Sequence, residues 1–472
     1  MNRGCLQRLY AIVWLTWKAA LRFRLFPVIS ALLLISVVGL PLLIKDDGTA
    51  RGFTQILLTY TLTAITALLG LSTLWLACGT LARDIEECQI QMVAVKPIAR
   101  WEIWLGKWLG IVSLDAVLLA LSGACVYGLL QWRAHRLPPD QQQVLRDEVL
   151  VARGSAREPN FDKTIDARTD QLLRERLQKN PLDIAGANLD EVRRQIRENV
   201  KAAFQLTPPG YQSRPWKINL GQASRRLRDQ PLFLRVKFNT AESSYKGASA
   251  TYNGMFQVGI EGKTRFWRSD VVNMSAETFH EFQLPPNLFD ENGMLTIVFA
   301  NLDETAILFP LEDGVEILYR QGGFGLSFAR GLGILLCWMA LLAALGLASA
   351  SILSFPVAAF FSLGLLFMAL CSGTLAGAVE EGTIANYNAE KGTKGFSPAD
   401  PVVIPVFRAA LKVIRLAMDF SPVDSLSTGR SVTWTQLGMA FSQIVILMGG
   451  FFGLLGVLLL SRRELATAQG TQ

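Results

Sequence analysis

Residues 53–82, FTQILLTYTLTAITALLGLSTLWLACGTLA, run for 30 residues without a charged side chain. A helix needs about 20 mostly apolar residues to cross a bilayer, so this stretch is long enough to span a membrane and to tilt or project beyond it. Residues 25–44 and 437–460 are also uncharged, and residues 331–379 continue without charge for longer than one span requires. The fold class that the sequence predicts is therefore a polytopic α-helical membrane protein.

The number of apolar runs predicts six transmembrane helices. The third run, Trp108–Trp132, carries a single charge at Asp115. Small and polar residues around Ser349–Ser354, followed by Pro356, divide residues 331–379 into two helices joined by a tight turn. The predicted order is three spans, a large charged insert, and three more spans.

Basic residues beside the apolar runs predict the orientation. They gather in the N-terminal segment, in the loop between the second and third spans, and directly after the last span at Arg462 and Arg463. With six spans these regions share one side, and the excess of basic residues in cytoplasmic loops places that side inside the cell. Residues 6–24 mix aromatic and basic side chains at helical spacing, which favours an interfacial amphipathic helix over the ragged start of the first span. We expect a multi-pass protein of the bacterial cytoplasmic (inner) membrane, with its insert on the extracytoplasmic side.

Charge is concentrated in the insert. Residues 133–330 hold 52 of the 85 charged side chains, whereas the other 274 residues hold 33. The insert has 27 basic and 25 acidic residues, so the net charge of +7 arises mostly beside the apolar runs. This distribution is typical of a membrane protein, and we expect the lipid bilayer but no nucleic acid among the partners.

The insert has an α+β pattern. Residues 133–213 look helical, with one helix expected at Thr164–Lys179 and another opened by a capping-box pattern at Asn188 and Glu191. Residues 214–325 switch to short period-two segments separated by Gly, Asn and Pro, which predicts a β-sandwich of jelly-roll type. The predicted domains are 1–132, 133–213, 214–325 and 326–472.

A further amphipathic helix is predicted between the fifth and sixth spans. Residues 402–420, VVIPVFRAALKVIRLAMDF, are too short and too charged to span a bilayer. Their four charged residues after Pro405 are spaced by four, three and four, so they share one helix face. We expect this helix to lie on the extracytoplasmic surface, either beside the exit of a pathway or packed under the insert. The charged residues are Arg408, Lys412, Arg415 and Asp419.

The stretch most informative about function is the polar loop between the second and third spans, residues 83–110, RDIEECQIQMVAVKPIARWEIWLGKWLG. It has an Arg-Asp-x-Glu start, a proline, an arginine three residues later, and Gly-Lys opening the next helix. The residues at these positions are Arg83, Asp84, Glu86, Pro97, Arg100, Gly106 and Lys107. In this pattern the chain resembles the ABC-2 type permeases, the membrane subunits of one class of ABC transporter, and most of all their NosY-like branch. Cys88 stands where that family commonly has glycine.

This resemblance, which extends over residues 1–132 and 326–472, implies a permease subunit of an exporter. Its loop 83–107 would couple to a separate cytoplasmic ABC ATPase subunit, and a second permease copy or a related permease would complete the pathway. Charged residues would set the docking register, and Trp101 and Trp104 would anchor the interface. The alternative is an ordinary solvated loop. Because the sequence has no G-x-x-x-x-G-K-[ST] motif, ATP is expected on the partner subunit, with no cofactor and no catalytic residues in this chain.

Asp115 is the one ionisable residue inside a predicted span. A charged group is costly in lipid, so its presence indicates either a transport pathway or a partner on a neighbouring helix. Lys107 precedes it by about two helical turns and is one candidate partner. The two histidines and the spacing of the six cysteines fit no metal-site pattern, so no metal is expected.

Two other functions stay as alternatives. A non-transport scaffold or sensor would present the insert as an extracytoplasmic binding domain, although a sensor usually needs only one or two spans. A membrane enzyme would need catalytic groups, for which the adjacent carboxylates Glu380 and Glu381 are the candidates.

Overall fold

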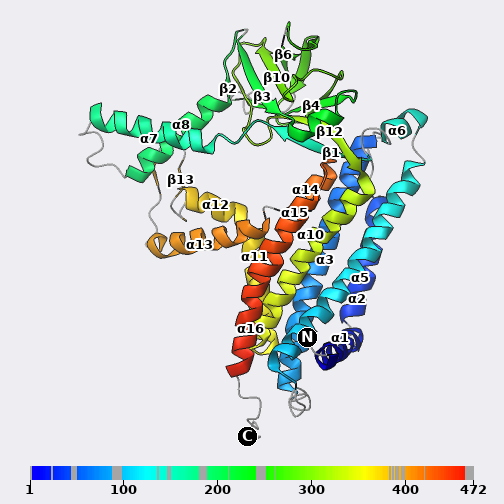
Figure 1. Cartoon of the computed structure of the whole chain (residues 1–472). Helices are drawn as coiled ribbons and strands as arrows, with labels where there is room; N and C mark the ends of the chain where they lie inside the picture. The colour runs from blue at the N-terminus through cyan, green and yellow to red at the C-terminus, as the bar shows by residue number, and fades with distance from the viewer. Residues whose placement is uncertain are drawn as a thin grey trace. The chain divides into compact units, whose positions relative to one another are not determined.

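The chain folds into two units, one formed by residues 1–152 and 322–472 and the other by residues 153–321. The first unit is helical, and the second contains the larger β-sheets (Figure 1). The computed structural model describes residues 3–22, 25–43, 50–87, 98–135, 138–145, 150–179, 189–210, 212–240, 251–260, 262–381, 384, 387–388, 393–394, 399–418 and 420–462.

The apolar runs of the sequence form the long helices of the first unit, because a helix satisfies its backbone hydrogen bonds internally. A short two-stranded pair, β13 (Tyr387–Asn388) and β14 (Thr393–Lys394), also belongs to this unit. The helices in chain order are α1 (Arg3–Arg22), α2 (Leu25–Leu43), α3 (Ala50–Glu86), α5 (Arg100–Ala134), α6 (Pro139–Val144), α10 (Phe324–Ala350), α11 (Phe355–Leu370), α12 (Ser372–Glu381), α13 (Asp400–Met418), α14 (Pro422–Ser427), α15 (Trp434–Ala440), the π-helix η3 (Phe441–Gly449) and α16 (Gly450–Arg462).

Four segments among the described residues are long and apolar enough to cross a membrane: Thr54–Glu86, Arg100–Ala134, Phe324–Ala350 and Trp434–Arg462. Two further helix pairs meet the same criteria only when taken together. These are α1 with α2, bent by 76°, and α11 with α12, bent by 63°. The described chain therefore has four candidate spans, or up to six if each bent pair crosses once. The predicted number of six depends on these two pairs.

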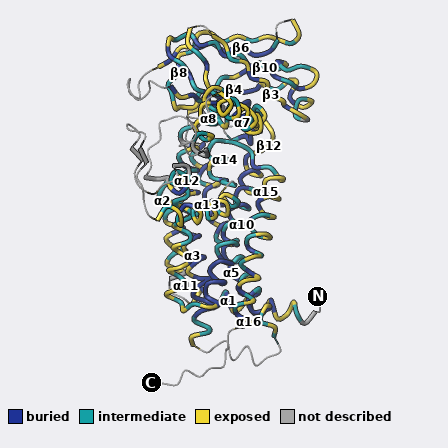
Figure 2. The backbone as a smooth tube through the Cα atoms, turned by 90° about the vertical axis from the view of Figure 1, so that its left-hand side faces the viewer, coloured by how far each residue is buried: buried dark blue, intermediate teal, exposed yellow. Residues whose placement is uncertain are grey.

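Large apolar side chains stay exposed along the outer faces of the long helices (Figure 2). Phe360 and Phe367 of α11 are 80% and 68% exposed, and Leu454 of α16 is 70% exposed. Contiguous apolar surface of this kind is rare on soluble monomers and indicates an apolar surrounding. The exposed faces therefore agree with a helical membrane protein.

The breaks between helices have local causes. The break predicted around Ser349–Ser354 lies between α10 and α11, where Ser354 precedes the first residue of α11 and Pro356 occupies its first turn. A second break, at Cys371 between α11 and α12, has no proline or charged residue to announce it in the sequence. The long apolar run therefore forms three helices instead of two.

Helix α1 packs on α5 through one narrow stripe. Leu9, Ile12, Thr16 and Ala20 are buried, at the three- and four-residue spacing of one helix face. The neighbouring Trp14 is half-exposed. This division into a buried and an exposed face is the amphipathic pattern expected from residues 6–24.

Residues 400–418 form α13, which overlaps the predicted amphipathic helix. Its basic residues Arg408, Lys412 and Arg415 are exposed, whereas Ile404 and Leu411 are buried. Asp419, the acidic end of the predicted face, lies outside the described residues.

The second unit is built from two larger sheets. One has the order β1–β12–β4–β9, and the other has the order β3–β10–β6–β7 with β8 also paired to β6. Strand β10 runs antiparallel to both β3 and β6, and β4 runs antiparallel to β9 and β12. The strands are β1 (Val151–Arg157), β2 (Leu206–Thr207), β3 (Ser213–Asn219), β4 (Leu232–Val236), β5 (Asn239–Thr240), β6 (Thr251–Val258), β7 (Trp267–Arg268), β8 (Val272–Ser275), β9 (His280–Leu284), β10 (Met294–Asn301), β11 (Ile307–Leu308) and β12 (Val315–Gly323).

Both sheets bury side chains in one core. Phe256 and Phe299 come from one sheet, Leu234 and Ile317 come from the other, and all four are fully buried. Burial alternates along β6 and β10, which is the period-two pattern seen in the sequence, whereas all five residues of β4 are buried. A β-rich unit with its own core is therefore present.

Two helices accompany the sheets. Helices α7 (Asp162–Lys179) and α8 (Leu189–Gln205) pack through Ile165, Ile196 and Val200, close to the two helices predicted for this region.

The region predicted as helical also contains a strand, β1. Its sequence, VARGSAR, has no apolar alternation, and its Arg153 is buried only because it forms an ion pair with Glu281 of β9. A long-range pairing of this kind leaves no local signal.

Candidate functional site

The residues of the predicted coupling loop lie mostly on two long helices. Helix α3 continues to Glu86 and α5 begins at Arg100, so both extend well past the roughly 30 Å of a bilayer core, α3 to about 55 Å. Pro97 and Cys88 fall within residues 88–97, outside the described part of the chain. The remaining motif residues gather where the end of α3 meets the start of α5, and we call this region the α3–α5 end (Figure 1).

Lys107 links the two helices at this end. Its buried Nζ donates to the backbone oxygen of Thr80 at 2.9 Å and forms an ion pair with Asp84. The Asp84 side chain is one-third exposed, so water still reaches one side of the pair. A paired and hydrogen-bonded cation tolerates this burial, whereas an unpaired one would not.

Arg83 and Glu86 hold the start of α11. The Arg83 guanidinium lies 4.6 Å from the ring centre of Phe355, the first residue of that helix. Glu86 accepts the backbone N–H of Phe355 at its Oε1, 2.8 Å away. The first N–H groups of a helix have no partner within the helix, and a carboxylate there also favours the helix dipole. The end of α3 therefore fixes where α11 begins.

Arg100 holds the end of α16. Its Nη1 donates to the backbone oxygens of Leu460 and Ser461, both at 2.7 Å. The last carbonyls of a helix lack partners within the helix, and a cation there complements the helix dipole. The first residue of α5 therefore caps the last helix of the chain.

Gly106 and Glu102 connect this end to α1. A Cβ on Gly106 would lie 2.7 Å from Cγ2 of Ile12, so only glycine allows α1 to pack this closely. Glu102 is buried, accepts the backbone N–H of Ala99 at 3.3 Å, and lies 3.6 Å from Nη1 of Arg8. Sequence reasoning did not single out Glu102, although its place three residues after the helix start is a capping signal.

The two tryptophans of the motif have opposite environments. Trp101, the second residue of α5, is 43% exposed. Trp104 is buried against α16, where a Cβ on Gly456 would lie 2.6 Å from its indole nitrogen. Only Trp101 of this pair is therefore accessible to a partner.

Asp115 lies deep between α3, α5 and α10. It is buried, and its Oδ2 lies 2.9 Å from the hydroxyl of Thr73, which also lies 3.7 Å from the sulfur of Met339. Its Oδ1 has no hydrogen-bond partner among the described residues. Lys107 pairs with Asp84 instead, so the neighbour of Asp115 is Thr73 on another helix.

Within the part of the chain that is described, no three His, Cys, Asp or Glu side chains lie close enough together to hold a metal ion. The chain was also compared with known proteins. No family model, curated protein or solved structure matches it. The evidence for function is therefore the arrangement of its own residues.

Proposed function

We propose that the chain is the permease subunit of an ATP-binding cassette exporter in the bacterial inner membrane. The observation that carries this proposal is the α3–α5 end, where side chains of two adjoining helix ends hold the ends of α11 and α16. A permease of this transporter class that has no ATP-binding motif of its own must receive mechanical work from a partner. A surface tied to several helices is suited to pass that work on.

The docking surface in this proposal consists of Trp101 and Glu86. Both are exposed, and tryptophan is among the residues that most often anchor a protein–protein interface. The partner is a cytoplasmic ABC ATPase subunit that carries the ATP. A second permease copy or a related permease supplies the other half of the pathway.

In this mechanism, closure of the ATPase subunits pushes on the α3–α5 end. The contacts of Glu86 with Phe355 and of Arg100 with Leu460 then move α11 and α16 together with α3 and α5. The partly buried Lys107–Asp84 pair keeps α3 and α5 moving as one body. The helices that line the pathway thereby change their relative positions during the ATP cycle.

The proposed topology has six spans, with each bent helix pair crossing once. The chain leaves the first unit at Ala152, after α5 and α6, and returns to it at Gly322, directly before α10. The C-terminal part of α5 and the N-terminal end of α10 lie together, with the rings of Tyr127 and Phe324 stacked 6.4 Å apart. These are the opposite ends from Arg100, so the proposal assigns the second unit to the extracytoplasmic side. Its two sheets are interpreted as a jelly-roll-like sandwich, and α13 as a helix on that surface.

Copurification tests the proposal. The tagged chain is purified from its native membranes, and associated subunits are screened by mass spectrometry for a Walker A sequence and assayed for ATP hydrolysis. Trp101→Ala and Glu86→Lys should reduce the recovered ATPase, while Trp132→Ala, an exposed tryptophan at the other end of α5, should not. Absence of any such subunit from the wild-type preparation would contradict the proposal.

The alternative of a membrane-anchored scaffold has one observation in its favour, since residues 153–321 form a unit with its own core. A scaffold requires that unit for all partner binding. If the chain is a permease, replacing residues 153–321 by a short linker should leave the ATPase bound. If the chain is a scaffold, the same replacement should release every partner.

A further inference from the structure

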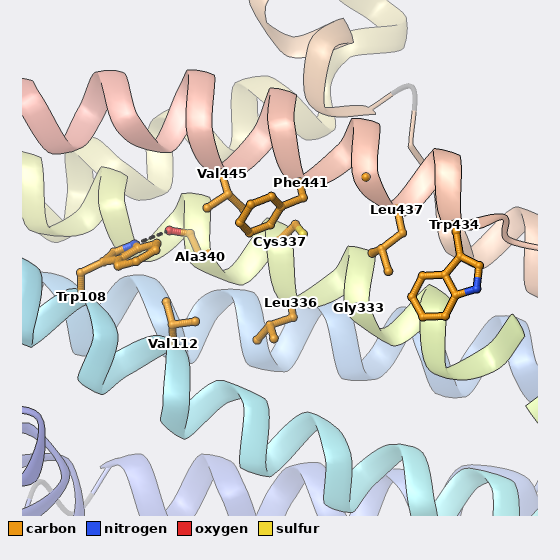
Figure 3. A pocket seen from close by; sticks show the side chains of 11 residues that line it. Trp108, Val112, Gly333, Leu336, Cys337, Ala340, Trp434, Leu437, Phe441 and Val445 are labelled. Carbon is orange, nitrogen blue, oxygen red and sulfur yellow. Dashed lines mark hydrogen bonds between the residues drawn. The ribbon is translucent and has the colours of Figure 1, made fainter. Parts of the chain in front are cut away.

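An apolar groove runs along the membrane-spanning part of the first unit. It has a volume of about 420 Å³ and lies between α5, α10 and the continuous helix α15–η3. Trp108 and Trp434 stand at its opposite ends, with Phe441 and Val445 between them (Figure 3). The side chains that line it are almost entirely apolar.

Local sequence explains the open space. Gly333 and Gly438 both line the groove, and a Cβ added to Gly438 would meet nothing within 4 Å. Phe441 and Val445 belong to the π-helix η3, a rare conformation that occurs frequently at functional sites. The groove is therefore bordered by a glycine without a side chain and by an altered segment of helix.

The groove has the length of one membrane leaflet. Trp434 and Val445 are eleven residues apart, which corresponds to about 16 Å along a helix. One leaflet contributes about half of the roughly 30 Å hydrocarbon core. Trp434 begins the last candidate span, and tryptophan is enriched where membrane meets water.

A cation stands at the Trp434 end of the groove. The Arg330 guanidinium lies 4.8 Å from the ring centre of Trp434, and its Nη1 donates to the backbone oxygen of Val432 at 2.7 Å. Its Nε is buried and has no hydrogen-bond partner, and no carboxylate forms an ion pair with Arg330, among the described residues. The charge of Arg330 is therefore not neutralised by an acidic side chain there, and the Nη groups, not the buried Nε, are the donors suited to bind a phosphate.

We propose that the apolar groove binds one anionic phospholipid, with an acyl chain between α10 and α15–η3 and its phosphate on Arg330. Groove length, apolar lining and the position of the charge agree on this occupant. The lipid would fill the space beside η3 and neutralise Arg330. This inference requires only that the first unit lies in a membrane, so it holds whether or not the chain is a permease.

Photo-crosslinking with lipids tests this proposal on the full chain. The chain is reconstituted in phosphatidylcholine vesicles with a small fraction of phosphatidylglycerol whose acyl chain carries a diazirine near the headgroup or at its end. Mass spectrometry should map the first probe to the peptide around Trp434 and the second to the peptide around Val445. The same two probes on phosphatidylcholine measure the preference for anionic lipid.

Two variants separate the contact with the acyl chain from the contact with the phosphate. Gly438→Leu fills open space and should abolish labelling at Val445, while Gly128→Leu, another helical glycine with nothing within 4 Å, should leave it unchanged. Arg330→Gln should reduce the preference for phosphatidylglycerol about tenfold, the effect of losing one charge-assisted contact, and Arg330→Lys should retain part of it.

Three results would overturn the proposal. The first is undiminished labelling at Val445 in Gly438→Leu, which would place the lipid elsewhere. The second is an equal preference for phosphatidylglycerol over phosphatidylcholine in wild type and Arg330→Gln. The third is crosslinking of the groove peptides to a second copy of the chain, which would identify protein as the occupant.

Discussion

Arg100, the first residue of α5, donates from Nη1 to the backbone oxygen of Leu460 at 2.7 Å, although the two residues are 360 positions apart. This bond joins the start of α5, the helix that contains the third predicted span, to the end of the last predicted span. Trp101, the residue next to Arg100, is exposed at the same place. A partner that binds Trp101 would therefore be in mechanical contact with α16.

Replacing Arg100 should separate docking from coupling. Arg100→Gln removes the cation that caps α16, and we expect a loss of about 1–2 kcal/mol in stability, measured as thermal unfolding in detergent. The ATPase should still copurify because Trp101 is untouched, but its activity in the complex should fall. Arg100→Lys keeps the charge but lacks the planar guanidinium, so its stability and ATPase activity should lie between those of the wild type and Arg100→Gln. Full activity in a folded Arg100→Gln complex would show that this contact transmits nothing.

The Lys107–Asp84 pair should show strong energetic coupling. Lys107→Met leaves Asp84 unpaired, and because that carboxylate is one-third exposed we expect a cost of about 1–3 kcal/mol, below that for a fully buried pair. Adding Asp84→Asn to Lys107→Met should recover part of the loss. Additive losses in this double-mutant cycle would mean that the two side chains do not stabilise each other.

Gly106 should be replaceable only if Ile12 is shortened. Gly106→Ala places a Cβ 2.7 Å from Ile12 Cγ2, and overpacking of this kind costs about 1–3 kcal/mol. Because Cβ of Ile12 would also lie only 2.8 Å from the new Cβ, relief of the clash requires Ile12→Gly in the same chain, and its effect on the melting temperature is compared with that of Ile12→Gly alone. Gly128→Ala, with nothing within 4 Å, serves as the control. Equal stability of Gly106→Ala and Gly128→Ala would contradict the close packing of α1 on α5.

Asp115 should tolerate loss of its charge better than loss of its neighbour. An asparagine can still accept the Thr73 hydroxyl, and it removes a buried carboxylate, so we expect Asp115→Asn to keep the wild-type melting temperature or raise it. Thr73→Val leaves the Asp115 carboxylate without this partner, and should cost about 1–3 kcal/mol. A stable Asp115→Asn complex that has lost ATP-driven activity would instead assign this residue to the transport pathway.

The sequence could predict the apolar helices because lipid demands long uncharged segments, and each of these is a local property. The break before Pro356 could also be predicted, because the small and polar residues and the proline that cause it are local features of the sequence. The π-helix η3 had no such signal, since the shift in backbone hydrogen bonding at Phe441–Gly449 depends on what packs against it. The strand β1 likewise depends on distant partners, since Arg153 pairs with Glu281 of β9 and the strand itself lies beside β12.

At the candidate site, the sequence identified the residue types but not their contacts. The motif forms one pattern in the sequence, yet its residues contact four helices, α1, α3, α11 and α16, that lie far apart in the chain. These residues are Arg83, Asp84, Glu86, Arg100, Gly106 and Lys107. Trp101 and Trp104 are three residues apart, and the sequence alone predicts the same anchoring role for both. Only the packing of Gly453 and Gly456 against Trp104 distinguishes them.

Orientation can be measured separately from function. In a cysteine-free background, single cysteines at Ser155 and Thr467 report the insert and the C-terminal segment. A membrane-impermeant thiol reagent added to intact cells should label position 155 and not position 467. The opposite pattern would reverse the proposed topology and would place the α3–α5 end outside the cell.

The central claim is that the α3–α5 end docks on an ATPase, and photo-crosslinking from Trp101 tests it most directly. A photoreactive amino acid at position 101, introduced in living cells, should crosslink the chain to a cytoplasmic subunit whose peptides contain a Walker A motif. The same amino acid at Trp132, an exposed position at the opposite end of α5, should not. Crosslinking of that subunit from position 132 but not from position 101 would contradict the account.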